Sequence, residues 1–186
     1  MSTAEHIRQV IGELERTLAA IGPEDAERLV DLILGARRVF VAGAGRSGLA
    51  MKAFAMRLMH LGLDTYVVGE TVTPGMGADD LLLIGSGSGE TGSLVAMAEK
   101  VRQLQGRLAL VTIVADSWIG RLAEVVVAIP APSPKARAAH GVTSVQPMGS
   151  LFEQSLFIFL DVVVLRLMEL QGVDAAAMFG RHANLE

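Results

Sequence analysis

The chain has 186 residues, enough for one domain with a large core but few for a catalytic domain plus a separate cofactor domain. It contains no cysteine, which excludes disulfides, thiolate catalysis and zinc sites with sulfur ligands, and favours a cytoplasmic location. The formal net charge of −4 and the few aromatic residues (6 Phe, 1 Tyr and 1 Trp) argue against a nucleic-acid partner.

The first 36 residues predict two helices. Ser2 and Glu5 form a capping-box pattern, apolar residues then recur at helical spacing, and Gly22-Pro23 separates this helix from a second one over 24–34.

From residue 37 onward, apolar strand patterns alternate with helical ones. The strand patterns are continuously apolar, which is typical of a parallel sheet buried on both faces. The sequence therefore predicts a three-layer α/β/α sandwich with a five-stranded parallel sheet. The expected strands are 38–42, 65–68, 81–84, 108–114 and 125–129, and the expected helices are 47–60, 91–104, weakly 119–123, and 151–170.

We expect a single domain over 1–186: N-terminal helices to residue 36, an α/β core over 37–172 and a polar tail over 173–186. A proline-containing loop over 129–149 is long enough to suggest a function, and its Lys135, Arg137 and His140 either cover a substrate or are simply solvated.

The composition is more apolar than that of an average soluble domain, with 51% apolar residues and a mean hydropathy of +0.45. The most apolar stretch, 156–168, contains Asp161 and Arg166 and is too short to cross a bilayer. We therefore expect no membrane association, and a homo-oligomer, either a dimer or a tetramer, whose interface buries the surplus.

A glycine-rich turn, Gly43-Ala44-Gly45-Arg46-Ser47-Gly48, follows the first strand and opens a helix. Glycines allow the backbone to approach an anion, and the helix N-terminus favours negative charge. The pattern also fits dinucleotide binding, with Glu70 near the end of the second strand as the ribose partner, or a tight turn without a ligand.

A second loop of this kind, 85–91 (GSGSGET), follows the third strand. Loops after neighbouring parallel strands meet at the carboxyl edge of the sheet, so the two loops would surround one small anion such as a phosphate. The alternative is that Ser88 or Thr91 only caps the next helix.

These loops resemble the sugar isomerase (SIS) domain family. The resemblance extends to the 6-phospho-3-hexuloisomerases of the ribulose monophosphate pathway through GAGRSGLAMKAFAMRLMHLG (43–62), VVGETVTPG (67–75), GSGSGET (85–91), QPMGSLFEQSLFIFLD (146–161) and RHANLE (181–186). It implies a flavodoxin-like fold and interconversion of 3-hexulose 6-phosphate and fructose 6-phosphate through an enediolate, without a cofactor. It also implies a phosphate site made by Gly45, Ser47, Ser86, Ser88 and Thr91.

By the same resemblance, Glu153 is the acid/base and His182 comes from the tail of another subunit. Each has a simpler alternative. Ser150 to Glu153 is also a capping-box pattern, and a tail histidine is often disordered. His60 is expected to be a hydrogen-bonded core or interface residue, and no histidine has metal-ligand spacing, so no metal is expected.

Two other functions use the same residues differently. A non-catalytic sugar-phosphate sensor needs the two loops but not Glu153. A small NAD-dependent dehydrogenase needs the first glycine motif and Glu70 but leaves the second loop without a role.

Overall fold

A computed structural model describes residues 1–134 and 143–185. The elements in chain order are α1 (Thr3–Ala19), α2 (Pro23–Leu34), β1 (Val39–Gly43), α3 (Gly45–Leu61), β2 (Thr65–Val67), β3 (Leu81–Gly85), α4 (Gly92–Gln103), β4 (Arg107–Thr112), α5 (Trp118–Leu122), β5 (Val125–Ala128), α6 (Ser150–Gln171) and α7 (Ala175–Phe179).

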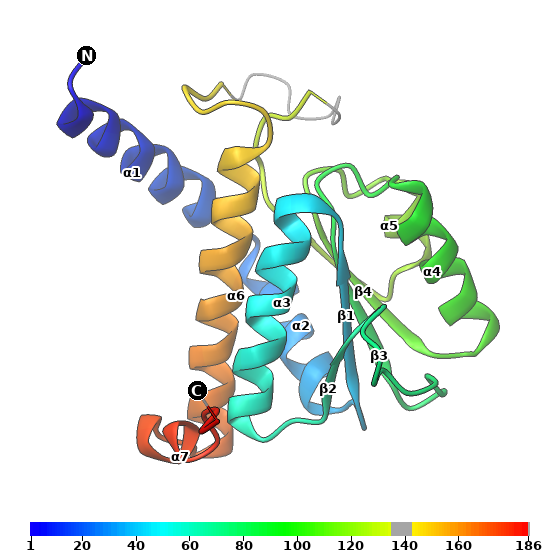
Figure 1. Ribbon diagram of the computed structural model, residues 1–186. Coiled ribbons are helices and arrows are strands. Elements are labelled where there is room, and N and C mark those ends of the chain that lie inside the picture. Colours follow the sequence, from blue (N-terminus) through cyan, green and yellow to red (C-terminus); the bar gives the residue numbers. More distant parts are fainter. Residues whose placement is uncertain (135–142, 186) are drawn as a thin grey trace.

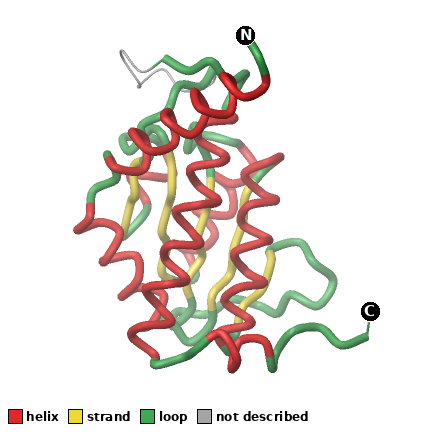
Figure 2. Tube along the Cα trace, turned by 90° about the vertical axis from the view of Figure 1, so that its left-hand side faces the viewer, coloured by secondary structure: helices red, strands yellow, loops and turns green. Residues whose placement is uncertain are grey.

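All neighbouring strands are parallel, and the strand order is β2-β1-β3-β4-β5. Every residue of β3 is buried, as expected for a strand with helices on both faces. One core cluster joins the sheet to α2, α3 and α6, and a second joins its other face to α4 and α5. The predicted three-layer sandwich is confirmed, and Figure 2 shows its helices in front of the strands.

Helix α6 packs most extensively on α3 and also contacts α1, which extends away from the body of the molecule in Figure 1. The predicted capping box of α1 is formed by Ser2 and Glu5. The tail contains a short helix, α7, that we did not predict from the sequence. Its 5 residues are too few to show a helical repeat of apolar residues. Asp174 starts it by accepting a hydrogen bond from the Ala177 amide at 2.8 Å.

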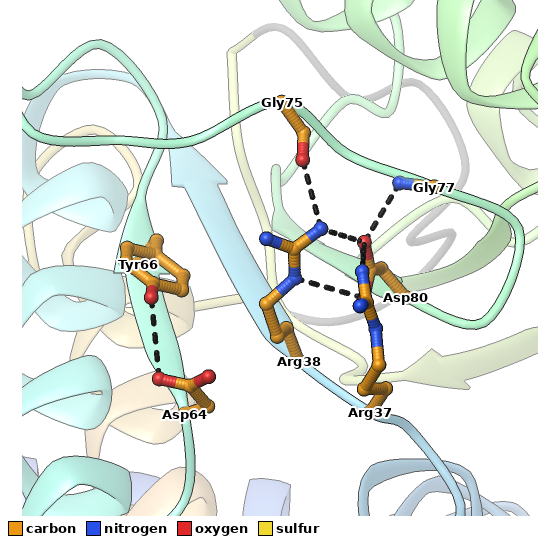
Figure 3. Close-up of polar contacts among 7 residues, drawn as sticks. All are labelled: Arg37, Arg38, Asp64, Tyr66, Gly75, Gly77 and Asp80. Atoms are coloured by element: carbon orange, nitrogen blue, oxygen red, sulfur yellow. Dashed lines mark hydrogen bonds and ion pairs between the residues drawn. The ribbon is translucent and has the colours of Figure 1, made fainter.

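An ion-pair network around one buried carboxylate lies at the amino edge of the sheet (Figure 3). The Asp80 carboxylate is fully buried and pairs with Arg38 at 2.6 Å and with Arg37 at 3.3 Å. It also accepts the Gly77 amide at 2.7 Å, while Arg38 donates to the Gly75 carbonyl at 2.8 Å. The network therefore fastens the segment between β2 and β3 to the start of β1.

None of the helices in the described ranges is both long and apolar enough to span a membrane. Several large apolar side chains are nevertheless exposed on the outward faces of α3 and α6. We call this set the α3/α6 face; it comprises Leu49, Met56, Met59, Phe157, Ile158, Val162 and Leu165.

Candidate functional site

The two glycine-rich loops begin side by side. Strands β1 and β3 are neighbours in the sheet, and Gly43 pairs in register with Gly85 at their carboxyl ends. The β1 and β3 connections leave on opposite faces of the sheet, so this is the point where ligands bind in open α/β sheets. The prediction that loops 43–48 and 85–91 meet at this edge is confirmed.

The first loop is a tight strand-to-helix turn. A Cβ on Gly48 would lie 2.7 Å from the Gly43 carbonyl oxygen, so neither glycine tolerates a side chain here. Gly45 has a positive φ of 57° and open space around it, and no side chain caps α3. Ser47 is buried in the first turn. The first amides of α3 can therefore receive an anion.

The second loop holds its hydroxyls by internal hydrogen bonds. Ser86 Oγ accepts the Gly89 amide and Ser88 Oγ accepts the Glu90 amide, each at 3.2 Å. Thr91 is the N-cap residue of α4, yet its side chain makes no capping hydrogen bond. The simpler alternative, a serine or threonine that only caps the helix, is therefore wrong for both candidates.

Glu153 lies in the first turn of α6, against the two loops. Phe152 packs on the second loop, since a Cβ on Gly87 would be 3.4 Å from its ring. Arg46 of the first loop donates from Nε to the Glu153 carboxylate at 2.6 Å. The half-buried Glu153 therefore faces the edge where the two loops meet.

The alternative role of Glu153 as a helix cap is wrong. Helix α6 begins at Ser150, so Gly149 is its N-cap residue, and no side chain forms a capping hydrogen bond. The capping-box pattern is displaced by one residue from the observed helix start. Arg46 pairs with the carboxylate instead. In the sequence, only the place of Arg46 inside the glycine motif pointed to a role for it.

A buried glutamate organises the chain that leads into α6. The Glu13 carboxylate of α1 accepts hydrogen bonds from Ser144 Oγ at 2.7 Å, the Val145 amide at 2.8 Å and Gln146 Nε2 at 3.1 Å. Burial raises the pKa of Glu13, but these hydrogen bonds and nearby Arg16 outweigh it, so the net pKa is lowered. Gln146 in turn accepts from Gln154 at 2.7 Å, beside Glu153.

His182 lies at the other end of the molecule from Glu153. Figure 1 shows the C-terminus at the lower ends of α3 and α6, whereas the glycine loops lie at their upper ends. From Gly45 to His60, 15 helical steps at about 1.5 Å each span about 22 Å along α3. The ring of His182 stacks on that of His60, with centroids 5.5 Å apart.

His60 is buried and hydrogen-bonded to Arg57, in line with the core or interface role expected for it. Glu70, the ribose partner of the dinucleotide alternative, forms an exposed ion pair with Lys52 at 2.9 Å. Lys135, Arg137 and His140 lie outside the described residues.

Within 1–134 and 143–185, no three His, Asp or Glu side chains are grouped to hold a metal.

Comparison with known proteins gives consistent matches over the whole chain. The SIS domain model matches residues 32–158. The 3-hexulose-6-phosphate isomerase of Bacillus subtilis is 48% identical over 186 residues, covering 100% of both chains. The enzyme of that name from Mycobacterium gastri is 45% identical over 174 residues, or 94% of this chain and 86% of its own.

Among solved structures, a Methanococcus jannaschii protein superposes with a TM-score of 0.84 at 31% identity. The match covers 98% of this chain and 99% of that protein, for which a 3-hexulose-6-phosphate isomerase function has been inferred. These comparisons agree with the site geometry and give no support to the dehydrogenase alternative.

Proposed function

The chain belongs to the SIS domain family, and we propose that it is an isomerase that interconverts 3-hexulose 6-phosphate and fructose 6-phosphate. The observation that carries this proposal is the meeting of loops 43–48 and 85–91 beside a carboxylate, Glu153. A phosphate anchor and a proton carrier are what this reaction needs. The site of action that we propose is the cytoplasm, since a chain without cysteine suits a reducing compartment.

The phosphate group of the substrate would bind between the two loops. The first-turn amides of α3 and the hydroxyls of Ser47, Ser86, Ser88 and Thr91 would donate hydrogen bonds, and the glycines, Gly45 among them, would let the backbone come close. Hydroxyl and amide donors bind a dianion without requiring a net basic protein, which fits the charge of −4.

The chemistry moves a carbonyl group between two adjacent carbons. Glu153 would remove the proton from C2 of 3-hexulose 6-phosphate, leaving a cis-enediolate over C2 and C3. It would then return a proton to C3, while the hydroxyl proton moves from O2 to O3. The product is an isomer of the substrate, and no electrons are gained or lost, so a single carboxylate can serve both steps.

The site needs a second copy of the chain. His182 would stabilise the developing enediolate oxygen, but in its own chain it stacks on His60, about 22 Å along α3 from Gly45. The exposed α3/α6 face includes Leu49, in the second turn of α3, and Leu165, which lines the pocket with His182. We therefore propose a homo-oligomer, a dimer or tetramer, in which this face is buried and His182 reaches a neighbouring subunit.

The test is Glu153→Gln, which preserves size and removes the proton carrier. We expect kcat for fructose 6-phosphate formation to fall by about 10³-fold while KM changes by less than about tenfold. Glu169→Gln is the matched control, because it makes the same change at the exposed C-terminal end of α6. Turnover by Glu153→Gln at the rate of this control would refute the assignment of the base.

A further inference from the structure

The C-terminal tail is an ordered part of its own subunit. Arg181 donates from Nη1 to the His60 carbonyl at 3.0 Å and to the Ala177 carbonyl at 3.4 Å. Its guanidinium also covers Gly62, whose φ of 93° ends α3; a Cβ there would lie 3.1 Å from Arg181. The tail is thus fastened to the C-terminal end of α3 one residue before His182.

The ring of His182 is held between two other rings. His60 lies on one side, with centroids 5.5 Å apart and planes at 22°, and Phe179 is 5.9 Å away at 24°. His182 Nδ1 also lies 2.9 Å from the Ala183 carbonyl oxygen, which can only accept a hydrogen bond. The exposed His182 therefore has a defined ring orientation, while the His60 ring beneath it is buried.

The contact with Arg57 determines the tautomer of the His60 ring. Its Nη1 lies 3.3 Å from His60 Nδ1, and a guanidinium can only donate, so Nδ1 accepts and the ring hydrogen is on Nε2. Burial lowers the pKa of His60, and the charge of Arg57 and the His182 ring lower it further. A neutral ring in one tautomer is a stable platform for stacking.

Both histidines line a pocket of about 490 Å³ between α3, α6 and α7. Arg57, Asp161 and Leu165 line it too, and Leu165 belongs to the exposed α3/α6 face. The pocket is therefore continuous with the surface that the proposed oligomer buries, which places the two rings where a neighbouring subunit would approach.

We propose that His60 is a positioning residue, whose ring orients His182 for the site of a neighbouring subunit. This inference rests on the proposed isomerase function. It predicts that His60 and His182 act as one unit, so losing the first matters only while the second is present.

A double-mutant cycle on the full chain tests this prediction. We expect His182→Ala to lower kcat by about 10²-fold, the scale of a lost donor to a developing oxyanion. His60→Ala should lower kcat by at least about tenfold with KM nearly unchanged, and the double variant should be no slower than His182→Ala alone. Losses that multiply in the double variant would overturn the proposal.

Two further variants separate positioning from folding. His60→Phe keeps a ring under His182 and should recover most of the activity that His60→Ala loses, whereas a structural loss of the pocket would not be rescued. His6→Ala, an exposed histidine on α1, is the matched control and should behave as the wild type. An inactive His60→Phe with an unchanged melting temperature would count against positioning.

A measurement that does not depend on enzyme activity separates the positioning role of His60 from the proposed isomerase function. The ring proton resonances of His182, followed by NMR, should shift in His60→Ala and remain near the wild-type position in His60→Phe. If the wild type fails to convert 3-hexulose 6-phosphate while these shifts occur, the proposed function is wrong and the stacking is real. If the resonances do not move, the positioning role is wrong.

Discussion

Replacing Asp80 with asparagine should destabilise the protein through loss of a buried charge partner. Asp80 is fully buried, but the Arg37 side chain is 61% exposed and that of Arg38 is 16% exposed (Figure 3), so water can reach the cations left behind and the cost should be about 1–3 kcal/mol. For a chain of this size, each kcal/mol lowers the melting temperature by about 2–4 °C. The expected fall is therefore about 2–12 °C at neutral pH.

The same carboxylate gives the wild type a distinct acid sensitivity. Hydrogen bonds from Arg38 and others lower the pKa of Asp80 from 3.8 to about 2 in the folded protein. A lowered folded pKa stabilises the protein above the unfolded pKa, here by about 2 kcal/mol, and this contribution is lost as the pH falls toward 2. About half of it should be gone by pH 3, and Asp80→Asn should lack this component.

Asp79→Asn provides the control, because it removes the same charge from an exposed neighbour. It should change stability by less than about 0.5 kcal/mol. Thermal and urea unfolding, followed by circular dichroism at one protein concentration from pH 7 to pH 3, would measure all three proteins. Equal stabilities for the two variants, or parallel pH profiles for all three, would refute this account of the network.

Three other changes probe the candidate site. The double variant Ser86→Ala/Ser88→Ala should raise KM at least about tenfold in steady-state assays; an unchanged KM would place the phosphate elsewhere. Gly48→Ala forces a Cβ to within 2.7 Å of a backbone oxygen and should lower the melting temperature sharply, whereas Gly92→Ala, with open space around it, should not. Glu13→Gln should cost about 1–3 kcal/mol in urea titrations and reduce kcat, since the segment before α6 loses its charged acceptor; wild-type values for both would contradict that role.

The sequence by itself determined the layers and the place of the two glycine-rich loops. Continuous apolar strands separated by helical patterns indicate a parallel sheet, because the crossover helices of such a sheet cover both of its faces. Glycines at the end of β1 and β3 mark where the backbone must turn tightly, and parallel strands bring such turns to one edge. The apolar periodicity and the glycines after the strands therefore predict the sheet and the position of its loops correctly.

Only the tertiary structure decided what the individual polar side chains contact. Nothing in the pattern around Glu153 distinguishes a cap from a base, since that depends on whether α6 starts at Ser150 or one residue later. The Arg46 contact joins residues 107 positions apart. Contacts between such distant residues arise from packing, which local periodicity does not encode.

The same holds for the C-terminal tail. Its polar composition predicted little order, yet α7 and Arg181 fasten it to α3 and bring His182 against His60. A short polar segment becomes ordered when a folded surface supplies its hydrogen-bond acceptors, and that surface exists only once α3 and α6 have packed together.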